Sequence, residues 1–129
     1  MKGYLLDTHV IIWLLSSPDE LSYRAKDIIQ DPHNKLYYSL LSMNEIAIKA
    51  SIGKIALGDD WQGVYQRLLA QKQILPLDLS WQAVSILQKL PFYHKDPFDR
   101  MLISCAMANQ LGLLSADRSC ALYDLPVIW

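Results

Sequence analysis

Short apolar runs alternate with longer amphipathic stretches along this chain. Each short run is ended by a polar or turn-forming residue, which is typical of a buried strand. Strands are expected at residues 3–6, 36–40, 74–77, 113–116 and 127–128. Apolar residues at helical spacing lie between them, and helices are expected at residues 10–15, 23–30, 42–51, 61–71, 81–89 and 97–108. The alternation of strand and helix predicts an α/β sandwich around a mainly parallel sheet.

Proline, glycine and aspartate add expectations about the ends of these elements. Pro76 is expected to make its strand irregular, because it cannot donate to a sheet ladder. Gly112 is expected to end the preceding helix in a left-handed conformation. Asp96 before Pro97 is the arrangement of a helix N-cap followed by the first helical residue.

Four acidic residues fall at equivalent places in this pattern. Asp7 ends the first strand, Glu45 lies one turn into the helix that leaves the second, Asp99 lies at a helix start, and Asp117 follows a strand. In an α/β sheet these places share one edge, where active sites collect. Four carboxylates there would repel one another unless a cation neutralised them. Their oxygens suit Mg²⁺ or Mn²⁺, which can activate water and stabilise charge on a phosphoryl group.

Each acid also has a local structural interpretation. Ser42 and Glu45 fit a capping box, which the local pattern alone favours. Asp96 is favoured as a helix cap rather than a ligand. Asp7 and Asp117 could be ordinary turn residues after strands. Their shared edge is what favours a joint site over these separate explanations.

Composition narrows the class of protein. A chain of 129 residues suits a single domain, expected to span residues 1–129, and 52% hydrophobic content favours a folded protein. The net charge of -1 gives no overall basic field, although a local patch would suffice for nucleic acid. Cys105 and Cys120 form no paired framework, which favours a reducing, cytoplasmic setting. No apolar segment approaches the ~18 residues of a membrane span.

The basic residues near the acids are candidate phosphate contacts. Lys49, Lys54 and Arg100 could contact substrate phosphates, although exposed lysines on helices are commonly only solvated. His94 could do the same or lie in a solvated, charged turn. The three histidines form no zinc-binding motif.

Four segments of the chain resemble a known family. They are Leu5–His9 (LLDTH), Ser42–Lys49 (SMNEIAIK), His94–Arg100 (HKDPFDR) and Ser115–Asp117 (SAD). In order and spacing they resemble PIN-domain ribonucleases, in particular the VapC-like toxins of bacterial toxin–antitoxin pairs. The resemblance implies an α/β/α sandwich on a parallel sheet and a metal-dependent endoribonuclease that leaves a 5′-phosphate.

The resemblance also assigns roles to individual residues. It implies that an acidic quartet binds Mg²⁺ or Mn²⁺, carried here by Asp7, Glu45, Asp99 and Asp117. Asp99 is preferred to Asp96, because the family places the acid directly before the apolar helix in the site. Thr8 and Ser115 match hydroxyl positions expected to bind a metal-bound water or to hold a carboxylate.

The resemblance further implies partners. A small antitoxin would fill the acidic groove, and an arginine reaching the carboxylates would be a natural inhibitory device. A homodimer is also expected, and RNA is the expected substrate. The chain departs from the family at Met43–Asn44, where a small-plus-aromatic pair is common, and at Cys120, where an aromatic is common. Neither departure removes an acid, but both put the RNA specificity in doubt.

Two other classes fit less well. A phosphoacceptor signalling domain also carries Mg²⁺-binding acids at strand ends, but it needs an acid pair where this chain has Asp7-Thr8, and a lysine after its last strand. A binding module that kept the fold and lost its activity is the second alternative, although all four acids are present.

Overall fold

The computed structural model describes residues 3–129. Its strands are β1 (Gly3–Leu6), β2 (Lys35–Ser39), β3 (Ile74–Leu77), β4 (Gly112–Leu114) and β5 (Val127–Ile128). Its α-helices are α1 (Thr8–Ser16), α2 (Tyr23–Gln30), α3 (Leu40–Ser51), α4 (Trp61–Gln71), α5 (Trp81–Lys89) and α6 (Pro97–Ala108). Two short 3-10 helices, η1 (Pro18–Glu20) and η2 (Arg118–Leu122), complete the described elements.

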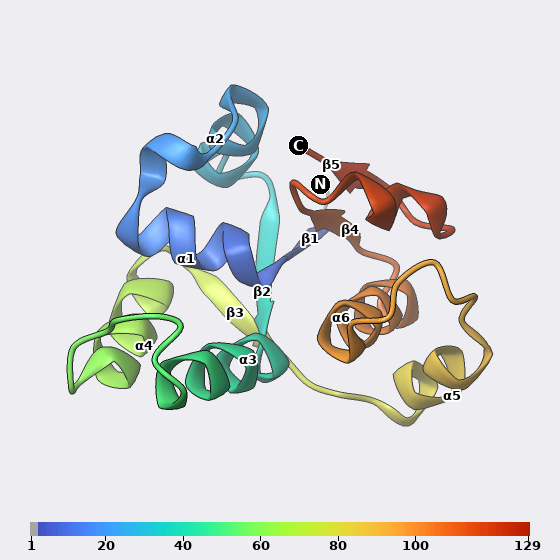
Figure 1. Ribbon diagram of the computed structural model, residues 1–129. Coiled ribbons are helices and arrows are strands. Elements are labelled where there is room, and N and C mark those ends of the chain that lie inside the picture. The colour runs from blue at the N-terminus through green and yellow to red at the C-terminus, as the bar shows by residue number, and fades with distance from the viewer. Residues whose placement is uncertain (1–2) are drawn as a thin grey trace.

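The strands form one parallel sheet in the order β3-β2-β1-β4-β5 (Figure 1). The chain moves from the central β1 outward to β3 and then crosses back to β4 on the other side of β1. The strand order therefore reverses between β1 and β4. In open α/β sheets, ligands bind beside such a reversal, at the carboxyl ends of the strands.

Helices cover both faces of the sheet. One core joins Leu6 and Leu114 to side chains of α1–α4, and the other joins Leu5 and Leu113 to side chains of α5 and α6. Helix α3 contacts both α1 and α6 (Figure 1). Neighbouring residues of β1 thus serve opposite cores, because successive side chains of a strand point to opposite faces. The predicted three-layer α/β/α sandwich with a parallel sheet is confirmed.

The predicted start of α3 and the predicted irregularity of β3 are wrong, although the predicted ends of β3 are confirmed. Helix α3 begins at Leu40 rather than at Ser42, because the Ser39 hydroxyl accepts from the Leu41 amide and caps the helix directly after β2. Strand β3 is regular through Pro76, with continuous register against β2. As an edge strand, β3 tolerates a residue that cannot donate.

The end of α6 also differs from the prediction. Gln110, with φ of 54°, takes the left-handed conformation expected of Gly112. Gly112 instead begins β4, where a Cβ would lie 3.1 Å from the Tyr4 ring. Strand β4 ends at Leu114, earlier than expected, because the Ser115 hydroxyl accepts from the Asp117 amide and turns the chain.

None of the helices formed by residues 3–129 has the length and apolar content needed to cross a membrane.

Candidate metal centre

Asp7 is held rigidly at the carboxyl end of β1. It caps α1, with Oδ1 accepting from the Thr8 amide (2.7 Å) and Oδ2 accepting from the Ser115 hydroxyl (2.7 Å). Its own amide donates to the Leu114 carbonyl of β4. The residue is only 7% exposed, and burial raises the pKa of its carboxyl despite the two hydrogen bonds. Both β1 and β4 therefore fix this carboxylate.

Glu45 of α3 lies near enough to Asp7 and Asp99 for its charge to raise the pKa of both. It is 5% exposed, and its Oε2 accepts from Lys49 Nζ at 2.9 Å, one turn along the helix. Its Oε1 is buried with no hydrogen-bond partner among residues 3–129. Because α3 begins at Leu40, Glu45 does not make the predicted capping box with Ser42. A buried carboxylate oxygen without a partner is costly unless something else satisfies it.

Thr8 and Ser42 connect the helices that carry these acids. The Thr8 hydroxyl donates to the Ser42 hydroxyl at 2.9 Å, and both residues are buried. Thr8 is expected to bind a metal-bound water or to hold a carboxylate, and in the described residues its hydroxyl donates to Ser42 and not to a carboxylate. Ser115 holds the Asp7 carboxylate, the second of the two arrangements expected of it.

Asp99 lies in the first turn of α6, close to the other acids. Burial and the negative charges of Asp7, Asp96 and Glu45 raise the pKa of Asp99 to about 7, against a smaller lowering by His94. Asp96 caps the helix, its side chain accepting from the Asp99 amide at 3.2 Å. The predicted cap is therefore confirmed, and Asp99 is the acid that shares the space of Asp7 and Glu45.

Asp117 has different surroundings. Its Oδ2 lies 3.0 Å from His94 Nε2, and its Oδ1 accepts from the amide and hydroxyl of Ser119. Burial would raise the pKa of Asp117, but the hydrogen bonds from Ser119 and His94 outweigh it and lower the pKa. The Asp117 side chain is 41% exposed. Its amide donates to the Ser115 hydroxyl, which links it to Asp7.

The role of His94 in this arrangement was missed. Its side chain is 8% exposed and stacks on the Tyr123 ring, so it does not lie in a solvated turn. Its ring faces Asp117 and Ser119. A contact with a substrate phosphate is the other expectation for this residue. The partners lie 23 and 25 residues away in sequence, so no local pattern could have paired them.

The predicted basic contacts divide into two kinds. Lys49 is paired with Glu45, and Lys54 lies in the exposed turn after α3. Arg100 is buried, and its guanidinium donates to the carbonyls of Leu90 and Pro91 at 3.1 and 2.7 Å. Arg100 therefore braces the segment before α6 and does not serve as the predicted phosphate contact.

The surroundings of Asp7, Glu45 and Asp99 fit a divalent cation. Burial and like charges raise the pKa of Asp7 and of Asp99, and a cation would relieve both effects, whereas Glu45 is already paired with Lys49 through Oε2. The raised pKa of Asp99 and the unsatisfied Oε1 of Glu45 are both signs of this crowding. An all-oxygen donor set suits Mg²⁺ or Mn²⁺. The three residues fit such an ion by the chemistry of their donors, but their oxygens do not form a group within 4.8 Å of one another among residues 3–129, so shared binding requires side-chain shifts.

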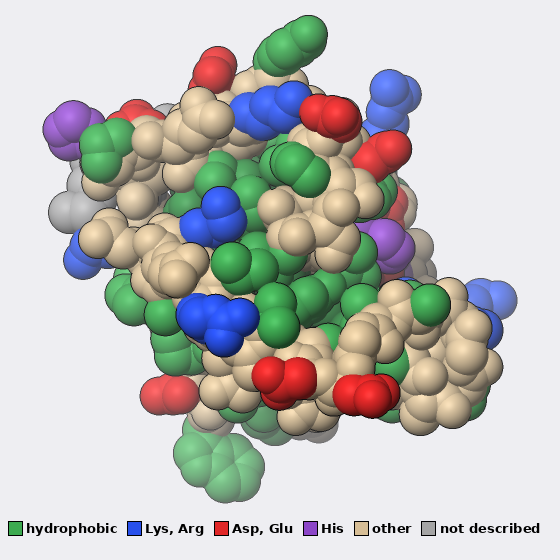
Figure 2. Space-filling view, turned by 90° about the vertical axis from the view of Figure 1, so that its left-hand side faces the viewer, with side chains coloured by type: hydrophobic (Ala, Val, Ile, Leu, Met, Phe, Trp, Pro, Cys, Tyr) green, Lys and Arg blue, Asp and Glu red, His purple; other side chains and the backbone are tan. Residues whose placement is uncertain are grey.

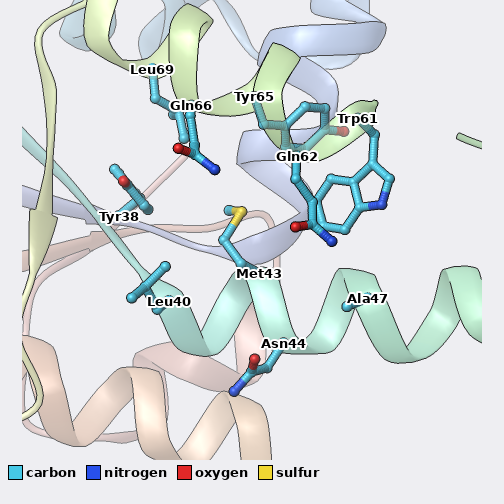
Figure 3. A pocket seen from close by; sticks show the side chains of 10 residues that line it. All are labelled: Tyr38, Leu40, Met43, Asn44, Ala47, Trp61, Gln62, Tyr65, Gln66 and Leu69. Atoms are coloured by element: carbon cyan, nitrogen blue, oxygen red, sulfur yellow. The ribbon is translucent and has the colours of Figure 1, made fainter. Parts of the chain in front are cut away.

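A separate groove of about 380 Å³ lies between α3 and α4 (Figure 3). Met43 points into it from α3, and Trp61 and Gln62 approach from α4 (Figure 3). None of the four acids lines it, although Asn44, the residue before Glu45, does. The hydroxyl of Tyr65, which also lines the groove, is buried without a partner among the described residues.

The fold and the acids at its strand-order reversal define an α/β protein of the PIN type. The sequence model of the PIN domain family matches residues 4–125, so the chain belongs to the PIN domain family. A comparison with curated proteins gives no match.

Several solved structures share the fold over nearly the whole chain. A chain of VapBC-1 from nontypeable Haemophilus influenzae is 20% identical, with a TM-score of 0.70 and coverage of 98% of this chain and 96% of that one. A chain of VapBC2 from Rickettsia felis, solved bound to a promoter DNA fragment, is 14% identical, with a TM-score of 0.66 and coverage of 98% and 97%. A chain of FitAcB from Neisseria gonorrhoeae is 21% identical, with a TM-score of 0.62 and coverage of 98% and 96%. At these identities the likeness is one of fold.

Proposed function

We propose that this chain is the toxin of a toxin–antitoxin pair, a Mg²⁺- or Mn²⁺-dependent endoribonuclease whose single domain spans residues 1–129. The crowding of Asp7, Glu45 and Asp99 at the strand-order reversal carries this proposal, because it creates a need for a cation. Membership of the PIN domain family supports it. VapC-like character is supported by the fold shared with the VapBC structures.

The proposed roles follow from how each side chain is held. Asp7, Asp99 and Asp117 would hold the cation, and Glu45 would bind it or position the attacking water. The bound ion would stabilise charge on the phosphoryl group and make water more acidic. Lys49 restrains Oε2 of Glu45, so Oε1 is the oxygen left to accept a proton from water.

The bond changes are those of hydrolysis at phosphorus. The water oxygen forms a bond to phosphorus while the bond to the 3′ oxygen breaks. The leaving 3′ oxygen takes up a proton and becomes a hydroxyl group, and the product carries a 5′-phosphate. The fixed orientation of Asp7 by Thr8 and Ser115 would keep the site in place during the reaction.

A small antitoxin is the partner we propose. The similar chains come from structures named for VapBC and FitAcB, and one further similar structure is described as a toxin–antitoxin family member from Mycobacterium tuberculosis. Hydrophobic side chains gather over the middle of the face formed by α1, α2 and α4, with Lys and Arg among them (Figure 2). The groove between α3 and α4, lined by both apolar and amide side chains, offers a second contact surface beside the residue that precedes Glu45. A partner segment seated there could carry an arginine toward the carboxylates.

The homodimer and the cytoplasmic location remain predictions from the resemblance and the composition. Size-exclusion chromatography with light scattering would test the first, and the location of a tagged chain in cells would test the second.

The test of the proposed function is metal-dependent RNA cleavage. The purified protein and its Asp7→Asn and Asp99→Asn variants are incubated with RNA, with and without Mg²⁺ or Mn²⁺. Asp27→Asn is the matched control, since Asp27 is an exposed acid on α2. We expect cleavage only with metal, 5′-phosphate ends, loss of activity in the two site variants, and full activity in the control.

Metal-independent cleavage, or full activity in both site variants, would overturn the mechanism. A folded protein that binds no divalent metal in calorimetry would favour the inactive binding module. Stable acyl-phosphate labelling would favour the phosphoacceptor domain.

A further inference from the structure

Two side chains beside Asp117 are not among the metal ligands of the proposed nuclease. His94 and Cys120 each offer a ligand atom that lies within 4.8 Å of the other and of an Asp117 oxygen. Cys120 is buried in η2, and its Sγ lies 3.9 Å from His94 Nε2. We propose that His94, Asp117 and Cys120 form a second cation site, which binds a borderline transition metal such as Zn²⁺ and shares Asp117 with the oxygen-ligand site.

The spacing of the three ligand atoms suits a small tetrahedral ion. With Zn–S near 2.3 Å and Zn–N near 2.0 Å, two ligands of one tetrahedral ion lie roughly 3.5 Å apart. His94 Nε2 lies 3.0 Å from Asp117 Oδ2 and 3.9 Å from Cys120 Sγ, on either side of that value. Small side-chain shifts would therefore complete the site, and the half-exposed Asp117 provides its access to solvent.

The orientation of His94 is fixed by groups outside the cluster. Its ring stacks on Tyr123 at 5.4 Å, with Nδ1 3.3 Å from the Tyr123 hydroxyl oxygen. That oxygen already accepts from the His94 amide at 2.9 Å. When the ion binds, the Nε2 proton that faces Asp117 in the metal-free chain moves to Nδ1, whose N–H donates to the same oxygen, and the Nε2 lone pair is then free to bind the ion. Metal-binding histidines are commonly oriented in this way through their second nitrogen.

The donor set separates this site from the first. Asp7, Glu45 and Asp99 offer only oxygen, which suits Mg²⁺, whereas thiolate and imidazole suit Zn²⁺ and its neighbours. Burial, with the nearby acids, raises the pKa of the Cys120 thiol to about 12, so the thiol keeps its proton without a metal. Binding of the ion forms a metal–sulfur bond and releases that proton to solvent.

One competing contact has to give way. The Ser119 hydroxyl lies 2.8 Å from His94 Nε2 and 2.6 Å from Asp117 Oδ1, so it occupies hydrogen-bonding positions that the ion would take. Removing this hydroxyl should therefore leave the binding of the ion unchanged or make it tighter. A purely structural role of the cluster predicts no such gain.

Occupancy of this site would withdraw Asp117 from the oxygen-ligand site. If the proposed nuclease function is correct, Zn²⁺ should then inhibit cleavage that Mg²⁺ supports. This consequence rests on the proposed function, whereas the binding itself does not. Binding is therefore measured first, by a signal that needs no RNA.

The experiment is an optical titration of the metal-free, reduced full chain with Co²⁺, a spectroscopic substitute for Zn²⁺. The chain has two cysteines, both buried, so Cys105→Ser is the matched control for Cys120→Ser. We expect a thiolate-to-cobalt charge-transfer band in the wild type and in Cys105→Ser, and its displacement by Zn²⁺. In Cys120→Ser the band should vanish and affinity should fall at least about tenfold, as even outer-shell changes cost that much.

Two further variants keep the proposal testable if Cys120→Ser does not fold. His94→Gln keeps the thiol and should weaken Co²⁺ binding, and Ser119→Ala should bind at least as tightly as the wild type. Absence of the band in the wild type would overturn the proposal, as would its persistence in Cys120→Ser or its loss in Cys105→Ser. A cobalt band without Mg²⁺-dependent cleavage would uphold the second site while rejecting the nuclease.

Discussion

The acids on the two sides of the site meet opposite surroundings. On one side, Asp7, Glu45 and Asp99 crowd together, and the pKa of Asp99 is raised to about 7 by burial and by like charges. On the other side, Asp117 accepts hydrogen bonds from Ser119 and faces His94, and its pKa is lowered. Aspartates at the same edge of the sheet therefore differ. The ionised form of Asp99 is disfavoured by its neighbours, whereas the ionised form of Asp117 is stabilised by hydrogen bonds.

This difference shows which half of the site needs a ligand. The hydrogen-bond partners of Asp117 come from the chain itself, so its carboxylate is stable as it stands. Glu45 Oε1 has no such partner within residues 3–129. Ionised Asp99 is repelled by the negative charges of its neighbours. The crowded side is therefore where a cation would gain most, because it would relieve repulsion that folding has already imposed.

The largest expected effect is that of Asp99→Asn on the crowded side. Loss of a metal ligand should lower Mg²⁺-dependent RNA cleavage by at least about 100-fold, since loss of outer-shell partners alone costs 10–100-fold. The same change should raise the melting temperature of the metal-free protein at pH 8, because it removes one of the mutually repelling charges. Cleavage assays and thermal melts in EDTA measure the two effects. A fall in both activity and stability would argue that Asp99 is a structural residue.

Ser115→Ala should produce the next largest effect, because the Ser115 hydroxyl holds the Asp7 carboxylate on the crowded side. It removes the hydrogen bond to Asp7 Oδ2 and the acceptor for the Asp117 amide, both buried or partly buried. We expect a loss of about 2–3 kcal/mol in the free energy of unfolding, as a bond to a charged group is worth ~1.5–3 kcal/mol. Chemical denaturation measures the loss. A loss in the free energy of unfolding smaller than that of Ser119→Ala would contradict the account.

The pH dependence of stability should distinguish the two sides. The pKa of Asp99 is about 7 in the folded protein, above the value of about 3.9 in the unfolded chain. The folded state therefore binds more protons, and stability should fall as pH rises between about 4 and 7. The raised pKa of Asp7 acts in the same direction. The slope should be smaller in Asp99→Asn, and Mg²⁺ should restore stability near pH 8. An identical slope in the variant would reject the assigned pKa.

Ser119→Ala should have the smallest effect. It removes the hydroxyl that donates to Asp117 Oδ1, but Asp117 keeps the Ser119 amide and His94 as partners and is partly exposed. The expected loss in stability is about 0.5–1 kcal/mol, the range of an ordinary hydrogen bond. A thermal melt of this variant beside Ser115→Ala makes the comparison. A cost equal to that of Ser115→Ala would mean that the two sides do not differ in burial as described.

Much of this arrangement follows from local patterns in the sequence. The strand and helix periodicity predicts the sheet, and Asp7 and Asp117 fall after strands whose carboxyl ends must meet. The N-cap Asp96 is also readable, because a cap depends on residues only a few positions away.

The remaining features depend on contacts between distant segments. The pairing of His94 with Asp117 and the bracing of the segment before α6 by Arg100 arise from tertiary packing, which no short window reveals. Gln110 takes a left-handed conformation because Gly112 is needed in β4, against the Tyr4 ring. The start of α3 was misplaced because Ser39 and Ser42 are both acceptable caps, and only the end of β2 decides between them.

The most direct test of the central claim is a crystal structure with Mn²⁺, located by its anomalous scattering. We predict an anomalous peak with ligands from Asp7 and Asp99 and from Glu45 directly or through water, and no such peak in Asp99→Asn crystals. A protein that cleaves RNA with Mn²⁺ but shows its only peak away from these carboxylates would contradict the account.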